Sequence, residues 1–163
     1  MKQSTIFITG AEGVGKSSIL EKIKLELPET EVHDFDEVGV PKNPPLKWRL
    51  DTTLHWLKFA MNKQSKKINV CIIGLSFPKE IKSFGEFKKL KNVYFLLLDI
   101  NEKEREKRLV KRGASREVIS DKRSLVELRK QIKNVDGKII DTSNLSINDV
   151  SSKLIKFLEK ILK

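Results

Sequence analysis

The sequence contains little cysteine, few aromatic residues and no long hydrophobic run. It has one cysteine in 163 residues, so no disulfide can form within the chain, and aromatic residues make up only 7%. No apolar run approaches the ~20 residues that a membrane-spanning helix requires. The residues before the first apolar run carry neither a signal-peptide core nor a cleavage site. We therefore expect a cytoplasmic protein with no membrane partner, formed by a single domain over residues 1–163.

Acidic residues are too few to balance the basic ones: 22 stand against 33, which leaves a net charge of +11. The excess consists mainly of lysine, with 26 Lys and 7 Arg spread along the chain. Bidentate recognition of phosphates favours Arg over Lys, and the Lys pairs have no interleaved aromatic residues on which bases could stack. We therefore expect a solvated Lys-rich surface or one that attracts anionic substrates; a nucleic-acid partner is the less favoured alternative.

What the sequence does contain is an alternation of short apolar segments with longer helical ones. Strands are expected over residues 4–9, 31–36, 68–73, 93–98 and 138–141, and helices over 16–26, 46–62, 102–112, 121–132 and from 146 onward. The segment 68–73 is almost continuously apolar, as a strand buried on both faces should be. The alternation predicts an α/β fold in which helices cover both faces of a parallel sheet, giving three layers.

The most specific signal lies between the first expected strand and the first helix. The run Gly10-Ala11-Glu12-Gly13-Val14-Gly15-Lys16-Ser17 matches the phosphate-loop pattern G-x-x-x-x-G-K-[ST] in full, and Ser18 follows it. Glycine lets backbone N–H groups turn toward a phosphate, and the positive end of the next helix lies under the same anion. We expect residues 10–18 to bind ATP, with Lys16 at the β- and γ-phosphates and Ser17 as a ligand of Mg²⁺. A Gly-rich turn that binds nothing is the alternative.

Three absences narrow the reaction that such a loop serves. The chain has no Asn-Lys-x-Asp sequence, which GTPases use to recognise guanine. The expected third strand ends in Ile73-Gly74-Leu75 and lacks the acidic residue that motor-type ATPases place there. The chain is also too short for the additional helical domain of most mechanical ATPases. Small kinases are the class that fits best.

Two acidic residues, Asp34 and Asp36, stand at alternate positions at the end of the expected second strand. Alternate side chains of a strand project to the same side, and the carboxyl ends of parallel strands face the ligand crevice. The pair could therefore hold Mg²⁺ through water and accept a proton from a substrate hydroxyl. A solvated acidic turn is the alternative interpretation.

Together with the phosphate loop, this pattern makes the chain resemble the nucleoside-monophosphate-kinase-like P-loop enzymes, especially shikimate kinase and the gluconate-kinase type. The resemblance extends over nearly the whole chain and implies a P-loop NTPase fold with a five-stranded parallel sheet in the order 2-3-1-4-5. It also implies that Asp34 assists Mg²⁺ and that Asp36 contacts the hydroxyl that accepts the phosphoryl group.

Two shorter segments carry further resemblances. Residues 75–79 are similar to a degraded Asp-Gly-Phe-Pro-Arg segment of adenylate kinases, with Leu75 in place of Asp and Lys79 in place of Arg. This departure argues against a nucleoside monophosphate as the acceptor. Residues 36–41, followed by Trp48-Arg49, resemble uncharacterised bacterial kinase-like P-loop proteins.

Four of the seven arginines, Arg105, Arg108, Arg112 and Arg116, fall within twelve residues after the expected fourth strand. The first three are spaced to share one helical face, and the segment 113–115 can act as a hinge. We expect a short basic lid over about 105–121, in which Arg108 and Arg112 stabilise the charge of the transferring phosphoryl group and exclude water. Salt bridges with the neighbouring glutamates are the alternative role for these arginines.

Three further residues are candidates for the ligand sites. Trp48 and Arg49 open the second helix beside the expected acceptor pocket, where they could bind the substrate; a packed Trp and a surface Arg would give the same pattern. Asn144 follows the last strand, in a turn that sits beside the adenine in such folds. The same polar residues also make a generic turn, so both interpretations of Asn144 stay open.

These observations predict an ATP- and Mg²⁺-dependent phosphotransferase. Its acceptor is expected to be a small hydroxyl-bearing or phosphorylated metabolite, such as a nucleoside, nucleotide, hydroxy acid or sugar. A P-loop ATP-binding switch, or an ATPase that acts with a protein or RNA partner, is the main alternative. The basic surface and the degraded segment at 75–79 are the features that support this alternative.

Overall fold

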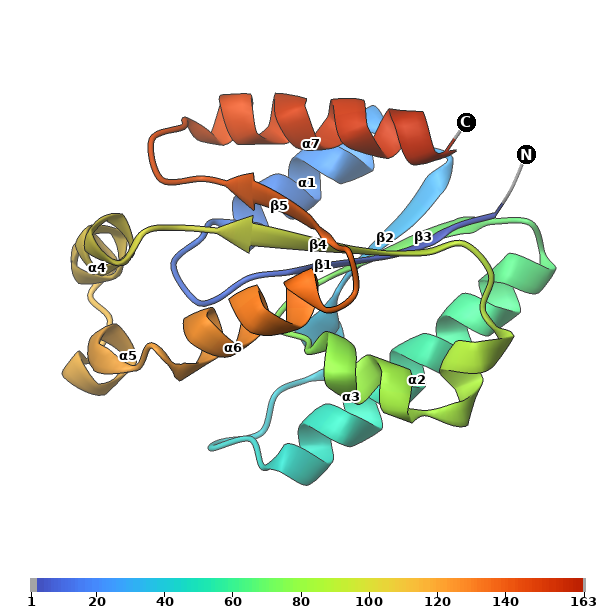
Figure 1. The fold of residues 1–163 in the computed structure, drawn as a ribbon, viewed down its shortest axis with the longest axis horizontal. Helices are drawn as coiled ribbons and strands as arrows, with labels where there is room; N and C mark the ends of the chain where they lie inside the picture. The colour runs from blue at the N-terminus through green and yellow to red at the C-terminus, as the bar shows by residue number, and fades with distance from the viewer. Residues whose placement is uncertain (1–2, 163) are drawn as a thin grey trace.

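Five parallel strands form one sheet in the order β2-β3-β1-β4-β5, which confirms the expected order. The computed structural model describes residues 3–162. The strands are β1 (Thr5–Thr9), β2 (Thr30–Asp34), β3 (Asn69–Ile73), β4 (Val93–Asp99) and β5 (Lys138–Asp141). Because all five strands run in the same direction, their carboxyl ends meet at one edge of the sheet (Figure 1).

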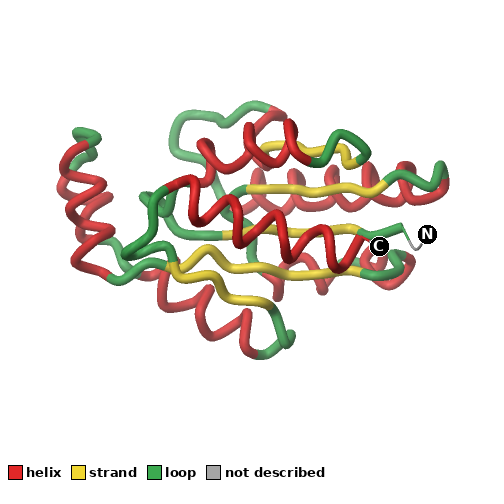
Figure 2. Tube along the Cα trace, turned by 90° about the horizontal axis from the view of Figure 1, so that it is seen from above, coloured by secondary structure: helices red, strands yellow, loops and turns green. Residues whose placement is uncertain are grey.

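Helices cover both faces of the sheet, so the three predicted layers are confirmed (Figures 1 and 2). The helices are α1 (Lys16–Glu26), α2 (Leu46–Ser65), α3 (Pro78–Ser83), α4 (Glu102–Lys111), α5 (Arg116–Ser120), α6 (Arg123–Lys133) and α7 (Ile147–Leu162). Helices α1 and α7 lie on one face, and α2, α3 and α6 lie on the other. Helices α4 and α5 extend past the carboxyl ends of the strands, on the left in Figure 1.

Side chains that alternate along the strands divide the core into two halves. In β1, Ile6 and Ile8 belong to the half under α1 and α7, whereas Phe7 belongs to the half that α2, α3 and α6 cover. Cys71 of β3 lies in the first half, and burial raises the pKa of its thiol. Burial on both faces explains why the central strands are nearly continuous apolar runs in the sequence.

The expected strands and helices are confirmed to within three residues at each end, and the second strand ends at Asp34 rather than at position 36. The Asp34 side chain accepts a hydrogen bond from the backbone N–H of Asp36 at 2.9 Å, and this turn starts a 3₁₀ helix over Phe35–Val38. The prediction that both acids occupy alternate positions of a strand is therefore wrong. The physical reason is that an Asp at a strand end can bond its own backbone two residues further on.

Helix α4 is attached to the phosphate loop. The guanidinium of Arg105 is buried and donates to the carbonyl oxygen of Glu12 at 3.0 Å. Its other donors bond carbonyls around α5, those of Val118, Ile119 and Asp121. Arg105, which the sequence places on one face with Arg108 and Arg112, therefore fixes α4 to the loop and to α5. Within residues 3–162, the fold offers no helix of the length and apolarity that crossing a membrane requires.

Candidate functional site

The phosphate loop leaves β1 at Gly10 and enters α1 at Lys16. Gly13 and Gly15 have φ angles of 93° and 97°, which side chains with a Cβ rarely adopt. An added Cβ on Gly10 would lie 2.9 Å from the carbonyl oxygen of Leu98, so the close approach of β4 requires glycine there. These glycines give the loop a shape in which backbone N–H groups can surround an anion.

Lys16 reaches back over the loop from the start of α1. Its ammonium donates to the carbonyl oxygens of Gly10 and Ala11, at 2.7 and 3.0 Å. Burial lowers the pKa of Lys16 to about 8, and the negative charges of Glu12, Asp36 and Asp34 partly offset this effect. A bound phosphate would add further negative charge beside this ammonium and favour its charged form.

The turn after β2 is held against β3 by close packing of Phe35 on Gly74. Phe35 is 1% exposed, and a Cβ on Gly74 would lie only 2.2 Å from the Cβ of Phe35. The indole of Trp56 donates to the Phe35 carbonyl oxygen at 2.9 Å and fixes the same turn. Because Phe35 points into the core, its neighbours Asp34 and Asp36 are left facing outward. The sequence analysis did not identify the role of Gly74. The feature that could have indicated it is a glycine that directly follows an apolar strand.

The pKa of Asp36 is raised from its ordinary value. The cause is chiefly burial, followed by the nearby charge of Asp34, while Lys16 acts in the opposite direction. A carboxylate with a raised pKa accepts a proton more readily at neutral pH. The position and the electrostatics of Asp36 therefore suit a proton acceptor.

A cleft of about 420 Å³ joins the phosphate loop to these acids. Eight residues singled out from the sequence line it: Glu12, Lys16, Ser17, Asp34, Asp36, Trp48, Arg49 and Arg112. Its other walls are Val40, Pro44, Gly74 and Leu75. The other predicted residues are not among its lining residues: Gly10, Ala11, Gly13, Val14, Gly15, Ser18, Arg108 and Asn144. The fold thus brings together side chains from the phosphate loop, the turn after β2, the start of α2 and the end of α4.

Trp48 and Arg49 are both fixed in place by neighbouring groups. The Trp48 indole donates to the carbonyl oxygen of Gly39 at 3.0 Å. Arg49 forms a two-point ion pair with Glu80 of α3, with N to O distances of 2.6 and 2.9 Å. Its guanidinium also lies 4.9 Å from the centre of the Phe77 ring. The sequence does not indicate that Glu80 pairs with Arg49, because Glu80 lies 31 positions from Arg49 and belongs to no motif.

The two predicted lid arginines occupy different places. Arg112 forms an ion pair with Glu12 of the phosphate loop, a pairing across 100 positions that no local pattern could reveal. Arg108 donates to the carbonyl oxygen of Thr142 at 2.7 Å, so it lies against the turn after β5, where Asn144 is exposed. It also bonds Glu104 at 3.2 Å, the kind of salt bridge that the alternative interpretation anticipates.

No protein-family model and no curated protein matches this sequence. Solved structures match it over nearly its whole length. The tunicamycin resistance protein of Deinococcus radiodurans has a TM-score of 0.68 at 19% identity, with 96% of this chain and 95% of that chain covered. A gluconokinase from Sinorhizobium meliloti has a TM-score of 0.63 at 17% identity, covering 99% and 94%. The shikimate kinase of Aquifex aeolicus has a TM-score of 0.62 at 18% identity, covering 96% of each chain. The fold is that of the P-loop small-molecule kinases.

In P-loop kinases, the Mg²⁺ that accompanies the nucleotide needs oxygen ligands. Residues 3–162 contain no group of three or more His, Cys, Asp or Glu side chains that could hold a metal ion. The cleft does offer the hydroxyl of Ser17 and the carboxylate of Asp34. Mg²⁺ in phosphotransferases is bound by one or two protein ligands together with substrate phosphates and water. The donor set therefore fits a metal ion that enters with the nucleotide.

Proposed function

We propose that the protein is an ATP- and Mg²⁺-dependent kinase that phosphorylates a hydroxyl group of a small molecule. The observation that carries the proposal is the sharing of one cleft by Lys16 and Ser17 of the phosphate loop and by Asp34 and Asp36. Its volume of about 420 Å³ lies within the range of small-ligand sites. A cationic end beside an acidic end suits a phosphate donor beside a hydroxyl acceptor.

At the donor end, the N–H groups of the loop and the Lys16 ammonium bind the β- and γ-phosphates. Ser17 and, through water, Asp34 would hold Mg²⁺, which when bound would supply positive charge at the phosphate oxygens. Arg112 exchanges its partner Glu12 for the γ-phosphate, where it stabilises the charge that spreads over the oxygens during transfer. Both residues are more than half exposed, at 60% and 51%, so this exchange requires little rearrangement.

At the acceptor end, Asp36 receives the proton of the substrate hydroxyl. The hydroxyl oxygen forms a bond to the γ-phosphorus as the bond from that phosphorus to the bridging oxygen breaks, and ADP leaves. Arg108 lies beside the turn that holds Asn144, which supports a role for its planar guanidinium at the base of the nucleotide. We therefore propose that Arg108 binds the nucleotide and that Arg112 acts in the transfer step.

A coupled ADP-release screen over nucleosides, nucleotides, sugars and hydroxy acids tests the proposal. The expected result is acceptor-dependent ADP release with one phosphorylated product per ADP. Asp36→Asn is expected to abolish that release while ATP binding persists, because the phosphate loop is unchanged. ATP binding without acceptor-dependent release over the whole panel would contradict the proposal.

A second candidate is a P-loop switch, in which ATP binding controls a protein or RNA partner. The net charge of +11 and the apolar Leu75 in the cleft wall favour this candidate. ATP hydrolysis that needs no acceptor and is stimulated by RNA or a protein partner would support it.

A further inference from the structure

The two ends of the cleft differ in the charge that they offer a ligand. At the phosphate end, the Lys16 ammonium donates to backbone carbonyls, so its charge is available to an anion. At the other end stand two carboxylates, those of Asp34 and Asp36. Lys16 is the cation whose charge reaches Asp36, and the proposed function assigns it to the nucleotide phosphates. Arg49 and Arg112 also line the cleft, but Glu80 and Glu12 balance their charges. The acceptor end therefore carries an excess of negative charge.

Arg49 is poorly placed to bind an anionic acceptor. Its two-point pair with Glu80 is partly buried, with side chains that are 31% and 19% exposed. Two-point pairs between a guanidinium and a carboxylate are among the stronger hydrogen-bonded contacts in proteins. A substrate anion that displaced Glu80 would leave that carboxylate half-buried and uncompensated, which is unfavourable. The Phe77 ring holds the guanidinium from a further side.

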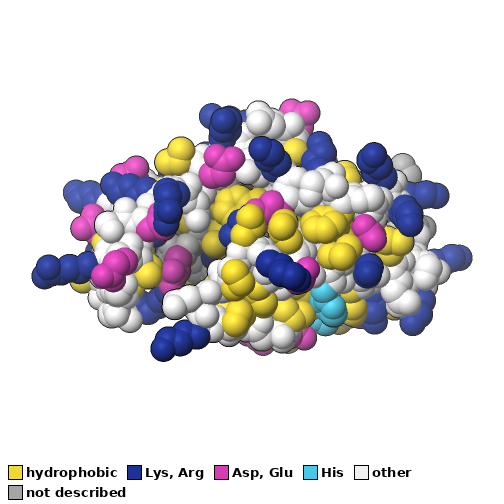
Figure 3. Space-filling model, turned by 90° about the horizontal axis from the view of Figure 1, so that it is seen from below, with side chains coloured by type: hydrophobic (Ala, Val, Ile, Leu, Met, Phe, Trp, Pro, Cys, Tyr) yellow, Lys and Arg dark blue, Asp and Glu magenta, His cyan; other side chains and the backbone are white. Residues whose placement is uncertain are grey.

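The cleft also has apolar walls. They are formed by Val40, Pro44, Trp48 and Leu75. The Trp48 ring is oriented by its hydrogen bond to Gly39 and presents a flat surface that suits an apolar group or a cation. Figure 3, viewed from the side of α2 and α3, shows hydrophobic side chains gathered in the middle of that face.

We infer that the acceptor is a hydroxyl compound with an apolar face and no negative charge, either uncharged or cationic. The inference rests on the proposed function, because it describes the acceptor of that reaction. In the proposed reaction Lys16 and Arg112 bind the phosphates of ATP. An anionic acceptor would therefore meet Asp34 and Asp36 without a further unpaired cation among the residues that line the cleft. Among the classes that the sequence leaves open, nucleosides, neutral sugars and amino alcohols therefore fit, whereas nucleotides and hydroxy acids do not.

Three small probes that share one ring but differ in charge test this inference. They are benzyltrimethylammonium, benzyl alcohol and benzenesulfonate, each titrated into the protein with Mg²⁺ and a non-hydrolysable ATP analogue. Trp48 lines the cleft whereas Trp56 is 3% exposed, so a fluorescence change reports on Trp48. We expect the cation and the alcohol to bind at least about tenfold more tightly than the anion, because like charges repel at close range.

Two glutamate variants separate the charge of the cleft from general effects. Glu80→Gln leaves Arg49 without its partner, so the anion should bind about tenfold more tightly and the cation more weakly. Glu127→Gln is the matched control, because Glu127 lines the same cavity of about 780 Å³ as Glu80 but bonds Gln131 and not Arg49. It should leave all three affinities unchanged. Trp48→Phe should remove the fluorescence response.

Each result either supports or overturns the inference. Anion binding as tight as cation binding in the wild type would overturn it, and so would a lack of response to all three probes. If the expected ranking holds but no hydroxyl compound is phosphorylated, the kinase proposal fails and the charge preference stands. If an anionic acceptor is phosphorylated with a higher kcat/KM than its uncharged counterpart, the kinase proposal stands and this inference fails.

Discussion

The ammonium of Lys16 is held in surroundings that disfavour its charge. Burial lowers its pKa to about 8, and its two hydrogen-bond acceptors are backbone carbonyls rather than carboxylates. A charge kept under such conditions lowers stability until an anion binds it. Sites that bind phosphate commonly trade stability for function in this way.

Replacing this residue should separate binding from stability. Lys16→Met removes the charge that would contact the β- and γ-phosphates, so ATP affinity should fall by ~10²-fold or more. The thermal unfolding midpoint should stay the same or rise, because a buried ammonium is replaced by an apolar side chain. Calorimetric titration and thermal unfolding measure the two effects. Wild-type ATP affinity in the variant would contradict the assignment of the loop.

Protonation of Lys16 should accompany ATP binding near pH 8. In the free protein the group is about half neutral there, since its pKa is about 8. Bound phosphate favours the charged form and raises the pKa, so the complex takes up protons. Roughly two pH units lower, the ammonium is protonated in both states and the uptake from Lys16 disappears.

Calorimetry in two buffers with different ionisation enthalpies measures this uptake. Lys16→Arg is the matched control, because a guanidinium stays charged throughout this pH range. The difference between the wild type and the control removes any contribution from the nucleotide itself. Equal uptake in both proteins would show that Lys16 is not its source.

Prediction from sequence at the residue scale succeeds where residues are contiguous. Lys16 and Ser17 belong to one motif and Asp34 and Asp36 to another, and all four do line the same cleft. Glu80 differs from these four residues, because the side chain with which it pairs, that of Arg49, is distant from it in the chain. A pairing of this kind depends on how α2 and α3 pack, which no local pattern encodes.

At the scale of elements, the turn after β2 depends on the space above Gly74. Gly74→Ala would place a Cβ 2.2 Å from that of Phe35, so the turn must move. We expect the free energy of unfolding to fall by about 1–3 kcal/mol, the usual range for overpacking. Phosphoryl transfer should fall with it, since the turn carries Asp36. ATP affinity should change less, because the phosphate loop is untouched.

Gly85→Ala is the matched control for this substitution. A Cβ at Gly85 meets nothing within 4 Å, so stability and transfer should stay near those of the wild type. Chemical unfolding and the coupled assay compare the two variants. Wild-type stability and transfer in Gly74→Ala would show that the turn tolerates displacement and that its packing does not position Asp36.

Helix α4 depends on Arg105 for its attachment to the loop and to α5. Arg105→Met leaves four backbone carbonyl bonds unmade, so the free energy of unfolding should fall by about 2–4 kcal/mol. The exposed Arg116 is a suitable control, and Arg116→Met should change stability by less than about 0.5 kcal/mol. Urea unfolding measures both. Equal stabilities would mean that the carbonyls find other partners.

This helix also marks a limit of prediction from sequence. The spacing of Arg105, Arg108 and Arg112 predicts a shared face, but α4 packs against different neighbours at each position. Arg105 is buried under the loop, Arg108 lies on the turn after β5, and Arg112 pairs with Glu12. Helical periodicity identifies residues on one side of a helix, whereas tertiary packing decides what each residue touches.

For the whole molecule, the alternation of apolar and helical segments is enough to predict a layered α/β fold. The order of the strands is not contained in that alternation, and the resemblance to known kinases supplied it.

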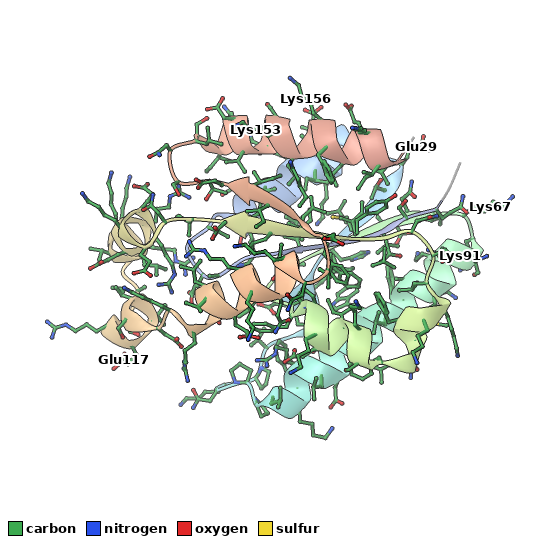
Figure 4. All side chains as sticks on the ribbon, in the orientation of Figure 1. Glu29, Lys67, Lys91, Glu117, Lys153 and Lys156 are labelled. Atoms are coloured by element: carbon green, nitrogen blue, oxygen red, sulfur yellow. The ribbon has the colours of Figure 1, made fainter. Side chains whose placement is uncertain are left out.

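The surface charge is a further property of the whole molecule. In Figure 4 the labelled lysines lie in two places: Lys153 and Lys156 on α7, and Lys67 and Lys91 just before β3 and β4. Such a distribution provides a general attraction for anions rather than a defined binding site.

The response of the protein to RNA at different salt concentrations separates a kinase from a switch. A short single-stranded RNA should bind weakly at low salt and dissociate as the salt concentration rises to about 0.15 M, because dispersed lysines act only through screened charge. RNA binding should leave the rate of ATP hydrolysis in the absence of an acceptor unchanged, since the labelled lysines are not among the residues that line the cleft. Fluorescence anisotropy and ADP release over a salt series measure the two quantities.

Lys16→Met should bind the RNA as the wild type does, because only one of many cations is lost. If RNA instead stimulates hydrolysis at about 0.15 M salt and Lys16→Met abolishes that stimulation, the cleft and the basic surface are coupled. The switch would then explain the protein better than the kinase.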